Sequence, residues 1–215
     1  LLLINPGSTS TKIAVYENDV PRLVRNIRHT VDELSSFSHI IDQFEFRKNL
    51  VLKELEANNI PFEFDAIVGR GGLLKPIPGG VYEVNDAMLD DILHAMRTHA
   101  CNLGCLIASE LAALLPGCRA FIADPGVVDE LDEIARITGS PLMPRITIWH
   151  ALNQRAIARR YAAEHDTRYE ELDLIVCHLG GGISVGVHHH GKAVDVNNAL
   201  DGEGPFSPER AGTLP

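Results

Sequence analysis

The chain opens with two short apolar runs that flank a polar loop. Residues 1–4 and 12–16 form these runs, and Asn-Pro-Gly-Ser-Thr-Ser-Thr lies between them. Apolar runs separated by turn-forming residues predict a β-hairpin. Residues 22–30 then alternate between apolar and polar positions, which predicts a third strand.

Several longer segments place apolar residues three and four positions apart, which is the spacing of an α-helix. Residues 32–59 predict a helix with a break near 44–46, and Asn85 predicts the N-cap of a helix that reaches about His99. Because short apolar strands alternate with such helices, the chain is predicted to be α/β. Further helices are predicted over 103–115, 127–137 and 151–164, and further strands over 65–69, 120–123, 172–179, 183–188 and 193–196.

One pattern occurs twice in the chain. The strand, polar loop and strand of residues 1–16 recur at 174–188, where three consecutive glycines form the loop. A repeated unit predicts two similar lobes that face a cleft. We expect the first lobe at residues 1–146 and the second at 147–215. Few residues follow the second copy, and a lobe of that size would be marginal alone, so the second lobe is expected to be incomplete.

Composition narrows the classes of function. The chain has 19 basic and 29 acidic side chains, a net charge of −10, and 45% of its residues are hydrophobic. This acidity argues against nucleic acid or an anionic membrane as a partner, because both need a positive field. It still allows a local basic pocket for a small anion. No apolar run reaches the length of about 18 residues that a transmembrane helix needs.

The cysteines and the other clusters of polar residues predict no metal centre. The four cysteines lack the spacing of zinc ligands or of a disulfide framework. We expect buried, reduced thiols, which are typical of a reducing compartment and therefore of the cytoplasm. The acidic run 129–133 is expected to be a solvated helix face, and the three histidines at 188–190 a solvated hairpin tip.

The first polar loop has the groups that hold phosphate. Asn5 opens it, hydroxyl side chains including Ser10 fill it, and Lys12 follows as a cation. Hydroxyls and backbone amides donate to phosphate oxygens, and a lysine offsets their charge. No Gly-Lys-Ser/Thr sequence closes the loop, so it is not a P-loop. A plain polar turn is the alternative interpretation.

The second loop consists of Gly180, Gly181 and Gly182, directly after His178-Leu179. Glycine lets the backbone approach a ligand closely because it has no Cβ. The loop therefore favours a nucleotide-phosphate site, with a tight turn as the alternative.

Four further side chains stand where α/β proteins bind ligands. Arg70 lies in a glycine turn after a strand and could hold a carboxylate or phosphate with two donors. Asp124 follows a strand end, and His150 directly precedes a helix. Arg210 lies in a loop rich in proline and glycine, and with Arg70 could clamp a transferring phosphoryl group. The structural alternatives are surface salt bridges for the arginines and helix capping for Asp124 and His150.

These residues lie in motifs that resemble the acetokinase family. Two segments carry the resemblance to the family: Ile4-Asn-Pro-Gly-Ser-Thr-Ser-Thr-Lys-Ile-Ala-Val-Tyr16 and Cys177-His-Leu-Gly-Gly-Gly-Ile-Ser-Val-Gly186. Three more resemble its butyrate kinase branch: Gly69-Arg-Gly-Gly-Leu-Leu-Lys-Pro-Ile-Pro-Gly-Gly80, Trp149-His-Ala-Leu-Asn-Gln-Arg155, and Asp195-Val-Asn-Asn-Ala-Leu-Asp-Gly-Glu-Gly-Pro-Phe-Ser-Pro-Glu-Arg-Ala-Gly212.

The resemblance implies an actin-like ATPase (ribonuclease H-like) fold and reversible transfer of the γ-phosphoryl group of ATP to a short-chain carboxylate. ATP/ADP and Mg²⁺ are the implied cofactors, and the full-length family members imply a homodimer or higher homo-oligomer. The residue roles follow by motif position: Asn5 at the metal; Ser10, Lys12, His178, Gly180, Gly181 and Gly182 at the nucleotide phosphates; Arg70 at the carboxylate; Asp124, His150 and Arg210 at the reacting groups.

Other functions stay open. Acetate or propionate could replace butyrate as the preferred acid. Family members continue past residue 215, and no adenosine-binding segment is recognisable here, so the chain could also be an inactive binding or assembly module. A hydrolase that uses His150 and Asp124 is disfavoured because the sequence has no nucleophile elbow.

Overall fold

A computed structural model describes residues 1–95 and 97–214, which divide into two compact units. The first unit comprises Leu1–Lys75 and Val81–Ala123, and the second comprises Pro76–Gly80 and Asp124–Pro215. None of the helices in the described residues combines the length and the apolarity needed to cross a bilayer.

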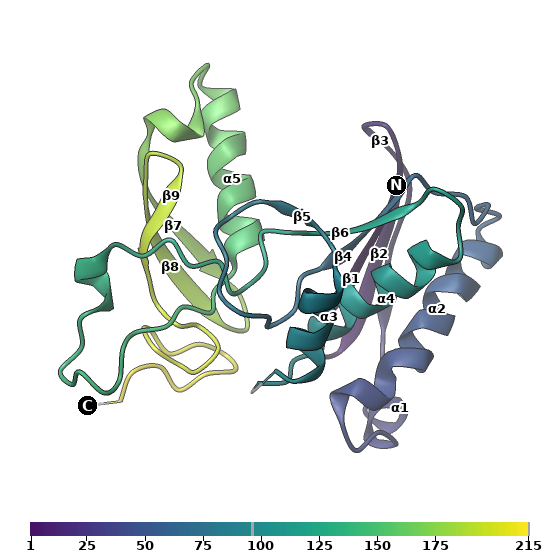
Figure 1. Ribbon diagram of the computed structural model, residues 1–215, viewed down its shortest axis with the longest axis horizontal. Coiled ribbons are helices and arrows are strands. Elements are labelled where there is room, and N and C mark those ends of the chain that lie inside the picture. Colours follow the sequence, from purple (N-terminus) through teal and green to yellow (C-terminus); the bar gives the residue numbers. More distant parts are fainter. Residues whose placement is uncertain (96, 215) are drawn as a thin grey trace. The chain divides into compact units, whose positions relative to one another are not determined.

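The first unit contains a mixed sheet with the strand order β3-β2-β1-β4-β6-β5 (Figure 1). The first three strands form an antiparallel meander, and β4 and β6 run parallel to β1. The predicted hairpin and third strand are therefore confirmed. The strand bounds are β1 (Leu2–Pro6), β2 (Ser10–Glu17), β3 (Val20–Arg28), β4 (Ala66–Arg70), β5 (Val81–Glu83) and β6 (Arg119–Ala123).

The core of this unit lies between the sheet and two helices. Alternate residues of β1, among them Leu2 and Ile4, are buried together with Val51 of α2 and Leu103 of α4. This alternation leaves the other face of β1 for polar side chains. The helices and the 3-10 turn are α1 (Val31–Ser35), η1 (Ile40–Gln43), α2 (Phe44–Ala57), α3 (Asp86–Leu93) and α4 (Asn102–Ala113).

Two of the predicted helices differ from those observed. The long helix predicted over 32–59 consists of α1, η1 and α2. Asn85 caps α3 as predicted, its side chain accepting from the Met88 amide, but α3 ends at Leu93. The remainder of that predicted helix includes residue 96, which lies outside the described residues.

A pair of glycines lets α4 lie directly on the sheet. A Cβ on Gly69 of β4 would overlap the Gly104 backbone, and a Cβ on Gly104 would lie 2.5 Å from the Arg70 carbonyl oxygen. This close approach fixes the end of β4, where Arg70 is found.

The second unit contains a three-stranded antiparallel sheet, β7-β8-β9, and the helix α5 (Figure 1). Helix α5 packs on one face of the sheet through Ala158 and Ala162, which cluster with Tyr169. The meander repeats the topology of β1-β2-β3, so the predicted repeat is confirmed. The bounds are α5 (Ala151–Glu164), η2 (Glu133–Arg136), η3 (Tyr169–Glu171), β7 (Asp173–Leu179), β8 (Ile183–His189) and β9 (Lys192–Val196).

The boundary between the units differs from the sequence expectation of 1–146 and 147–215. Residues 124–146 belong to the second unit because Val128 and Leu131 cluster with Trp149 and Val196. The assignment of one phosphate-binding hairpin to each of two lobes stays a prediction.

The helix predicted over 127–137 is wrong, since only Glu133–Arg136 forms a short 3-10 turn. The Val128 carbonyl accepts the Trp149 indole N–H at 2.7 Å, which ties this part of the chain down without helical hydrogen bonds. The expectation of a solvated acidic face at 129–133 holds only for Asp132 and Glu133, which are exposed. The Glu130 side chain is 9% exposed and pairs with Arg155 at 2.8 Å.

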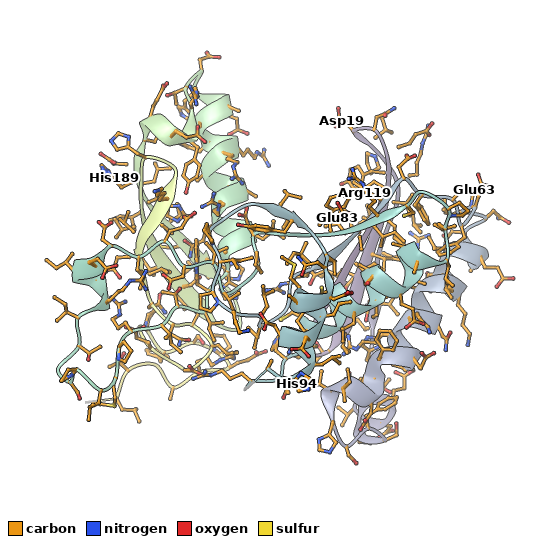
Figure 2. All side chains as sticks on the ribbon, viewed as in Figure 1. Asp19, Glu63, Glu83, His94, Arg119 and His189 are labelled. Carbon is orange, nitrogen blue, oxygen red and sulfur yellow. The ribbon has the colours of Figure 1, made fainter. Side chains whose placement is uncertain are left out.

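Two further expectations about burial need correction. His188 is fully buried, although His189 and His190 are exposed as predicted for a hairpin tip. Figure 2 shows His189 on the outside of the second unit. All four cysteines are free, but Cys177 is exposed rather than buried. Cys177 lies on the face of β7 that points away from α5, together with Ile175 and Leu179, which are also exposed. The apolar sequence of this strand therefore does not imply burial of every residue.

Candidate active site

Asn5, Lys12 and Arg70 lie side by side at the ends of neighbouring strands in the first unit. Asn5 is directly opposite Lys12 in the β1–β2 register. Arg70 follows Gly69, the partner of Ile4 in the parallel β1–β4 pair. Opposed residues project from the same face of a sheet, so these three side chains share the face opposite the core. The sequence predicted all three, and the strand register brings them together.

Arg70 has its donors available for an anion. Its Nη1 lies 3.4 Å from Asn5 Oδ1, and among the described residues no carboxylate forms a salt bridge with it. A guanidinium that lacks an internal acid can hold a carboxylate or phosphate with two parallel donors. The arrangement therefore agrees with a substrate-binding arginine better than with a structural ion pair.

The hairpin loop between β1 and β2 is closed by its own backbone. The Gly7 amide donates to the Ser10 carbonyl at 2.7 Å, and the His29 amide donates to the Thr9 carbonyl at 2.9 Å. Ser10 and Lys12 follow the loop on the same face of β2 as each other, while Thr11 points into the core and is fully buried. The side chains predicted for phosphate binding thus lie on the outer face.

The second predicted set of residues converges in the second unit, around the triglycine loop. The rings of His150 and His178 are stacked with centroids 3.7 Å apart, and His150 Nδ1 lies 3.0 Å from Ser184 Oγ. A Cβ on Gly182 would lie 3.7 Å from His150 Cε1 and 3.9 Å from Arg210 Cζ. His150, His178, Gly182 and Arg210 are therefore neighbours.

Two glycines of this loop lie close to neighbouring side chains. A Cβ on Gly180 would lie 2.7 Å from His178 Nε2, and one on Gly181 would lie 2.7 Å from the carboxyl carbon of Glu209. The Ser207 hydroxyl donates to the Gly181 carbonyl at 2.6 Å. The loop thus packs between His178 and the segment that leads to Arg210.

Arg210 is held by main-chain groups. Its Nε donates to the Leu200 carbonyl at 3.1 Å, and its Nη1 lies 3.4 Å from Glu209 Oε2. The Glu209 side chain is 66% exposed and Arg210 25% exposed. The contact is therefore a weak, solvated one, and the guanidinium can exchange it for a stronger anion.

Asp124 is the centre of an ion-pair cluster. Its carboxylate lies 3.0 Å from Arg155 Nε and 3.2 Å from Arg159 Nη1, and it accepts the Gly80 amide at 2.9 Å. The residue is 5% exposed and has a positive φ of 36°, a strained conformation for a non-glycine residue. Asp124 thus orients two arginines, and the N-cap alternative does not apply because no helix begins at the following residues.

Sequence reasoning missed the residues that position this second set. Ser184 is fully buried and bonds to His150, Asn153 bonds to His178 at 2.7 Å, and Arg155 bridges Asp124 and Glu130. Ser184, Asn153 and Arg155 all lie within the motifs that carry the family resemblance. The spacing of these residues along the chain does not indicate their positioning role. Their contacts are tertiary, since they join α5 to β7, to β8 and to the loop at residue 130.

A second histidine cluster lies at the hairpin tip. Potential ligand atoms of Asp173, His189 and His190 all lie within 4.8 Å of one another. All three residues are exposed. His189 Nδ1 lies 2.5 Å from Asp173 Oδ1, and this hydrogen bond explains why the two side chains lie close together without a metal.

Asn5 is compatible with a metal that arrives with a nucleotide. Mg²⁺ keeps several waters and is bound by one or two protein oxygens together with substrate phosphates. One amide oxygen beside a phosphate-suited loop fits that pattern. The described part of the first unit has no cluster of acidic, histidine or cysteine ligands that would hold the ion without phosphate.

The fold is similar to that of an acetate kinase and a propionate kinase. The acetate kinase of Porphyromonas gingivalis matches with a TM-score of 0.67 at 19% identity, over 100% of this chain and 61% of that protein. A propionate kinase of Francisella tularensis matches with a TM-score of 0.66 at 16% identity and the same coverage. The predicted α/β, actin-like fold class is confirmed. No protein-family model matches the chain.

The sequence comparison leads to butyrate kinases. The chain is 79% identical over all 215 residues to a probable butyrate kinase of Bacteroides thetaiotaomicron, and 56% identical to butyrate kinase 2 of Clostridium acetobutylicum. The resemblance to this branch is therefore confirmed. The chain spans 61% of the length of each of these relatives.

Proposed function

We propose that the protein is an ATP-dependent carboxylate kinase of the butyrate kinase type. The observation that carries this proposal is the 79% identity to a probable butyrate kinase along the whole chain. Two further observations support it: Lys12 and Arg70 lie beside Asn5 at the ends of neighbouring strands, and the glycine loop is flanked by His150 and Arg210.

The reaction we propose joins a carboxylate oxygen to the γ-phosphorus of ATP while the bond from that phosphorus to the bridging oxygen breaks and ADP leaves. A carboxylic acid with a pKa of about 4 to 5 is ionised near neutral pH, so its attack requires no general base. Asp124 then has no proton to abstract, which agrees with its two arginine partners. Its role is to orient Arg155 and Arg159.

The side chains divide between the acid and the phosphates. Arg70 holds the carboxylate with its free donors, while Ser10, Lys12 and the glycine loop with His178 hold the nucleotide phosphates. His150 and Arg210 donate to the equatorial oxygens of the transferring group, where negative charge is stabilised during transfer. Asn5 would hold the metal, which when bound neutralises phosphate charge. Positioning and charge stabilisation are the whole of the protein's contribution to this chemistry.

The remaining proposals concern partners and location. We propose a small carboxylic acid and a nucleotide as ligands, a homodimer or higher homo-oligomer for the full-length protein, and the cytoplasm as its compartment. Four free cysteines agree with a reducing environment.

A coupled assay tests the proposed reaction. Acyl phosphate is trapped as the hydroxamate with butyrate, propionate or acetate as acceptor, and Mg·ATP binding is measured by titration calorimetry. We expect product with butyrate and loss of most turnover in Arg210→Ala. No product with any acid, together with weak or absent Mg·ATP binding, would favour the inactive-module alternative. A higher kcat/KM with acetate or propionate would correct the substrate.

A further inference from the structure

Arg47, in the first turn of α2, is a fully buried arginine directly beneath the first hairpin loop. Its Nη1 donates to the Ser10 carbonyl at 3.1 Å and to Thr11 Oγ1 at 2.9 Å. Its Nε and Nη2 both donate to Gln43 Oε1, at 3.0 and 2.9 Å. Every partner is a neutral oxygen.

No carboxylate among the described residues offsets this charge. Burial lowers the pKa of Arg47 to about 10, which still leaves the guanidinium protonated near neutral pH. The other well-buried arginine, Arg155, contacts two carboxylates, Asp124 and Glu130. An unpaired buried charge is costly, so a neutral residue would have held α2 on the sheet at a lower cost. The feature that Arg47 adds is a fixed positive charge behind the loop.

Arg47 also binds one carbonyl group and one hydroxyl group of the loop from the core side. The Ser10 carbonyl accepts from Arg47 and from Gly7, and the Thr9 carbonyl accepts from His29. Thr11 Oγ1 lies between Arg47 and His29 Nε2, at 2.9 Å from each. Because the Ser10 carbonyl and the Thr9 carbonyl both have donors within the protein, their partial negative charges are partly offset and repel an anion on the outer face less.

We propose that Arg47 is a positioning residue for phosphoryl binding at the first hairpin loop. It fixes the Ser10 carbonyl and the Thr11 hydroxyl toward α2 and supplies a buried counter-charge to the phosphate oxygens of a nucleotide on the outer face. The identity of the ligand in this inference rests on the proposed kinase function. The fixing of the loop by Arg47 is independent of that function.

Two substitutions separate the charge from the packing. Arg47→Lys keeps a buried cation of similar length, and Arg47→Met keeps the volume without the charge. Arg25→Met is the matched control, because Arg25 is an exposed arginine of the same unit whose side chain bonds to Asn58, away from the loop. Circular dichroism and thermal melting establish that each variant is folded.

Hydrogen–deuterium exchange of the peptide covering residues 5–11 measures the fixing of the loop. We expect at least about tenfold faster exchange in Arg47→Met, because the loss of charge-assisted hydrogen bonds loosens the loop. Arg25→Met should match the unmodified chain. Unchanged exchange in a folded Arg47→Met variant would overturn the proposed fixing of the loop.

Steady-state kinetics measure the effect on phosphate binding. The KM for ATP should rise about tenfold or more in Arg47→Met, with the KM for butyrate unchanged, because charge-assisted contacts of this kind are worth about that factor. Arg47→Lys should recover most of the lost ATP affinity. Equal KM values for ATP in the Lys and Met variants would overturn the counter-charge role. Equal increases in the KM for ATP and the KM for butyrate in Arg47→Met would also overturn it.

The two proposals fail in distinguishable ways. If the unmodified chain forms no acyl phosphate, the proposed function fails for the 215-residue chain. The hydrogen–deuterium exchange measurement still tests whether Arg47 fixes the loop. Direct titration with inorganic pyrophosphate then tests the counter-charge role, with weaker binding to Arg47→Met than to Arg47→Lys expected. Equal pyrophosphate affinity in those two variants would overturn it.

Discussion

Three arginines have different environments. Arg70 has an amide oxygen as its nearest side-chain partner, Arg155 is neutralised by two acids, and Arg47 is buried among neutral oxygens. The free energy of a charged group depends on these surroundings more than on its position in a motif. Each environment therefore predicts a different result on substitution.

Substitution of Arg70 should act on the acid substrate. Arg70→Met is expected to lower kcat/KM for butyrate by about 10- to 100-fold, because a charge-assisted hydrogen bond is worth about 1.5–3 kcal/mol. Arg22→Met removes a cation from the exposed Arg22–Glu17 pair and is the control. Hydroxamate kinetics measure both. A decrease of the same size in the control would assign the effect to overall charge.

Buried His188 predicts a pH dependence of stability. Its Nε2 donates to Gln154 Oε1 at 2.9 Å, so its Nδ1 accepts the Tyr169 hydroxyl at 2.5 Å. Burial, aided by the charge of Arg155, lowers the pKa of His188 to about 4 from 6.5. The unfolded state then binds the proton more readily, and stability is lost as the pH falls from 6.5 toward 4, by up to about 3 kcal/mol.

Denaturant unfolding at pH 7.5 and pH 5 tests this pH dependence. His188→Gln should be less stable than the unmodified chain at pH 7.5 and should lose less stability on acidification. His190→Gln, at the exposed tip, should follow the unmodified chain at both pH values. An acid-induced loss that is unchanged by His188→Gln would assign it to other groups.

At this scale, the sequence predicted residues whose role depends on a motif and missed those whose role depends on a tertiary contact. Asn5, Lys12 and Arg70 were predicted to lie at strand ends, and the strand register brings them together. Arg47 was missed because a lone arginine in a helix is normally solvated. His188 was misplaced because its neighbours His189 and His190 do lie at the tip, and a strand alternates its faces.

Among the elements, the hairpins and α5 were predicted closely, and the segment after Asp124 was not. Alternating strands and the regular pattern of 151–164 contain their own signal. Residues 127–137 have a helix-like pattern, but their backbone groups bond to Ile77 and Val194 across the unit. Tertiary hydrogen bonds thus override the local preference.

The contact between β4 and α4 predicts a sensitive pair of glycines. Gly104→Ala would bring a methyl group to 2.5 Å from the Arg70 carbonyl, so we expect a destabilisation of about 1–3 kcal/mol from overpacking. Gly69→Ala should have a similar effect. Gly139→Ala, with open space around it, should change stability little. Chemical denaturation measures all three, and an effect of Gly139→Ala as large as the others would contradict the argument.

At the scale of the whole molecule, the two repeated meanders differ in the strands that flank them. In the first unit, β1 is flanked by β2 on one side and by the parallel strand β4 on the other. In the second, β7 pairs with β8 and has no other strand beside it in the described residues. The sequence predicted this repeat. It gave no boundary at residue 124, because the contacts that assign 124–146 to the second unit are long-range.

The open edge of β7 predicts self-association of the 215-residue chain. Ile175 and Leu179 are 73% and 76% exposed on this strand, and exposed apolar edge strands template pairing between chains. Ile175→Lys with Leu179→Lys should shift the chain toward monomer, because charges on an edge strand oppose pairing. Leu142→Lys, at a site 89% exposed outside any strand, should leave association unchanged. Sedimentation velocity over a range of concentrations measures the distribution. Association of the double variant equal to that of the unmodified chain would show that copies meet through another surface.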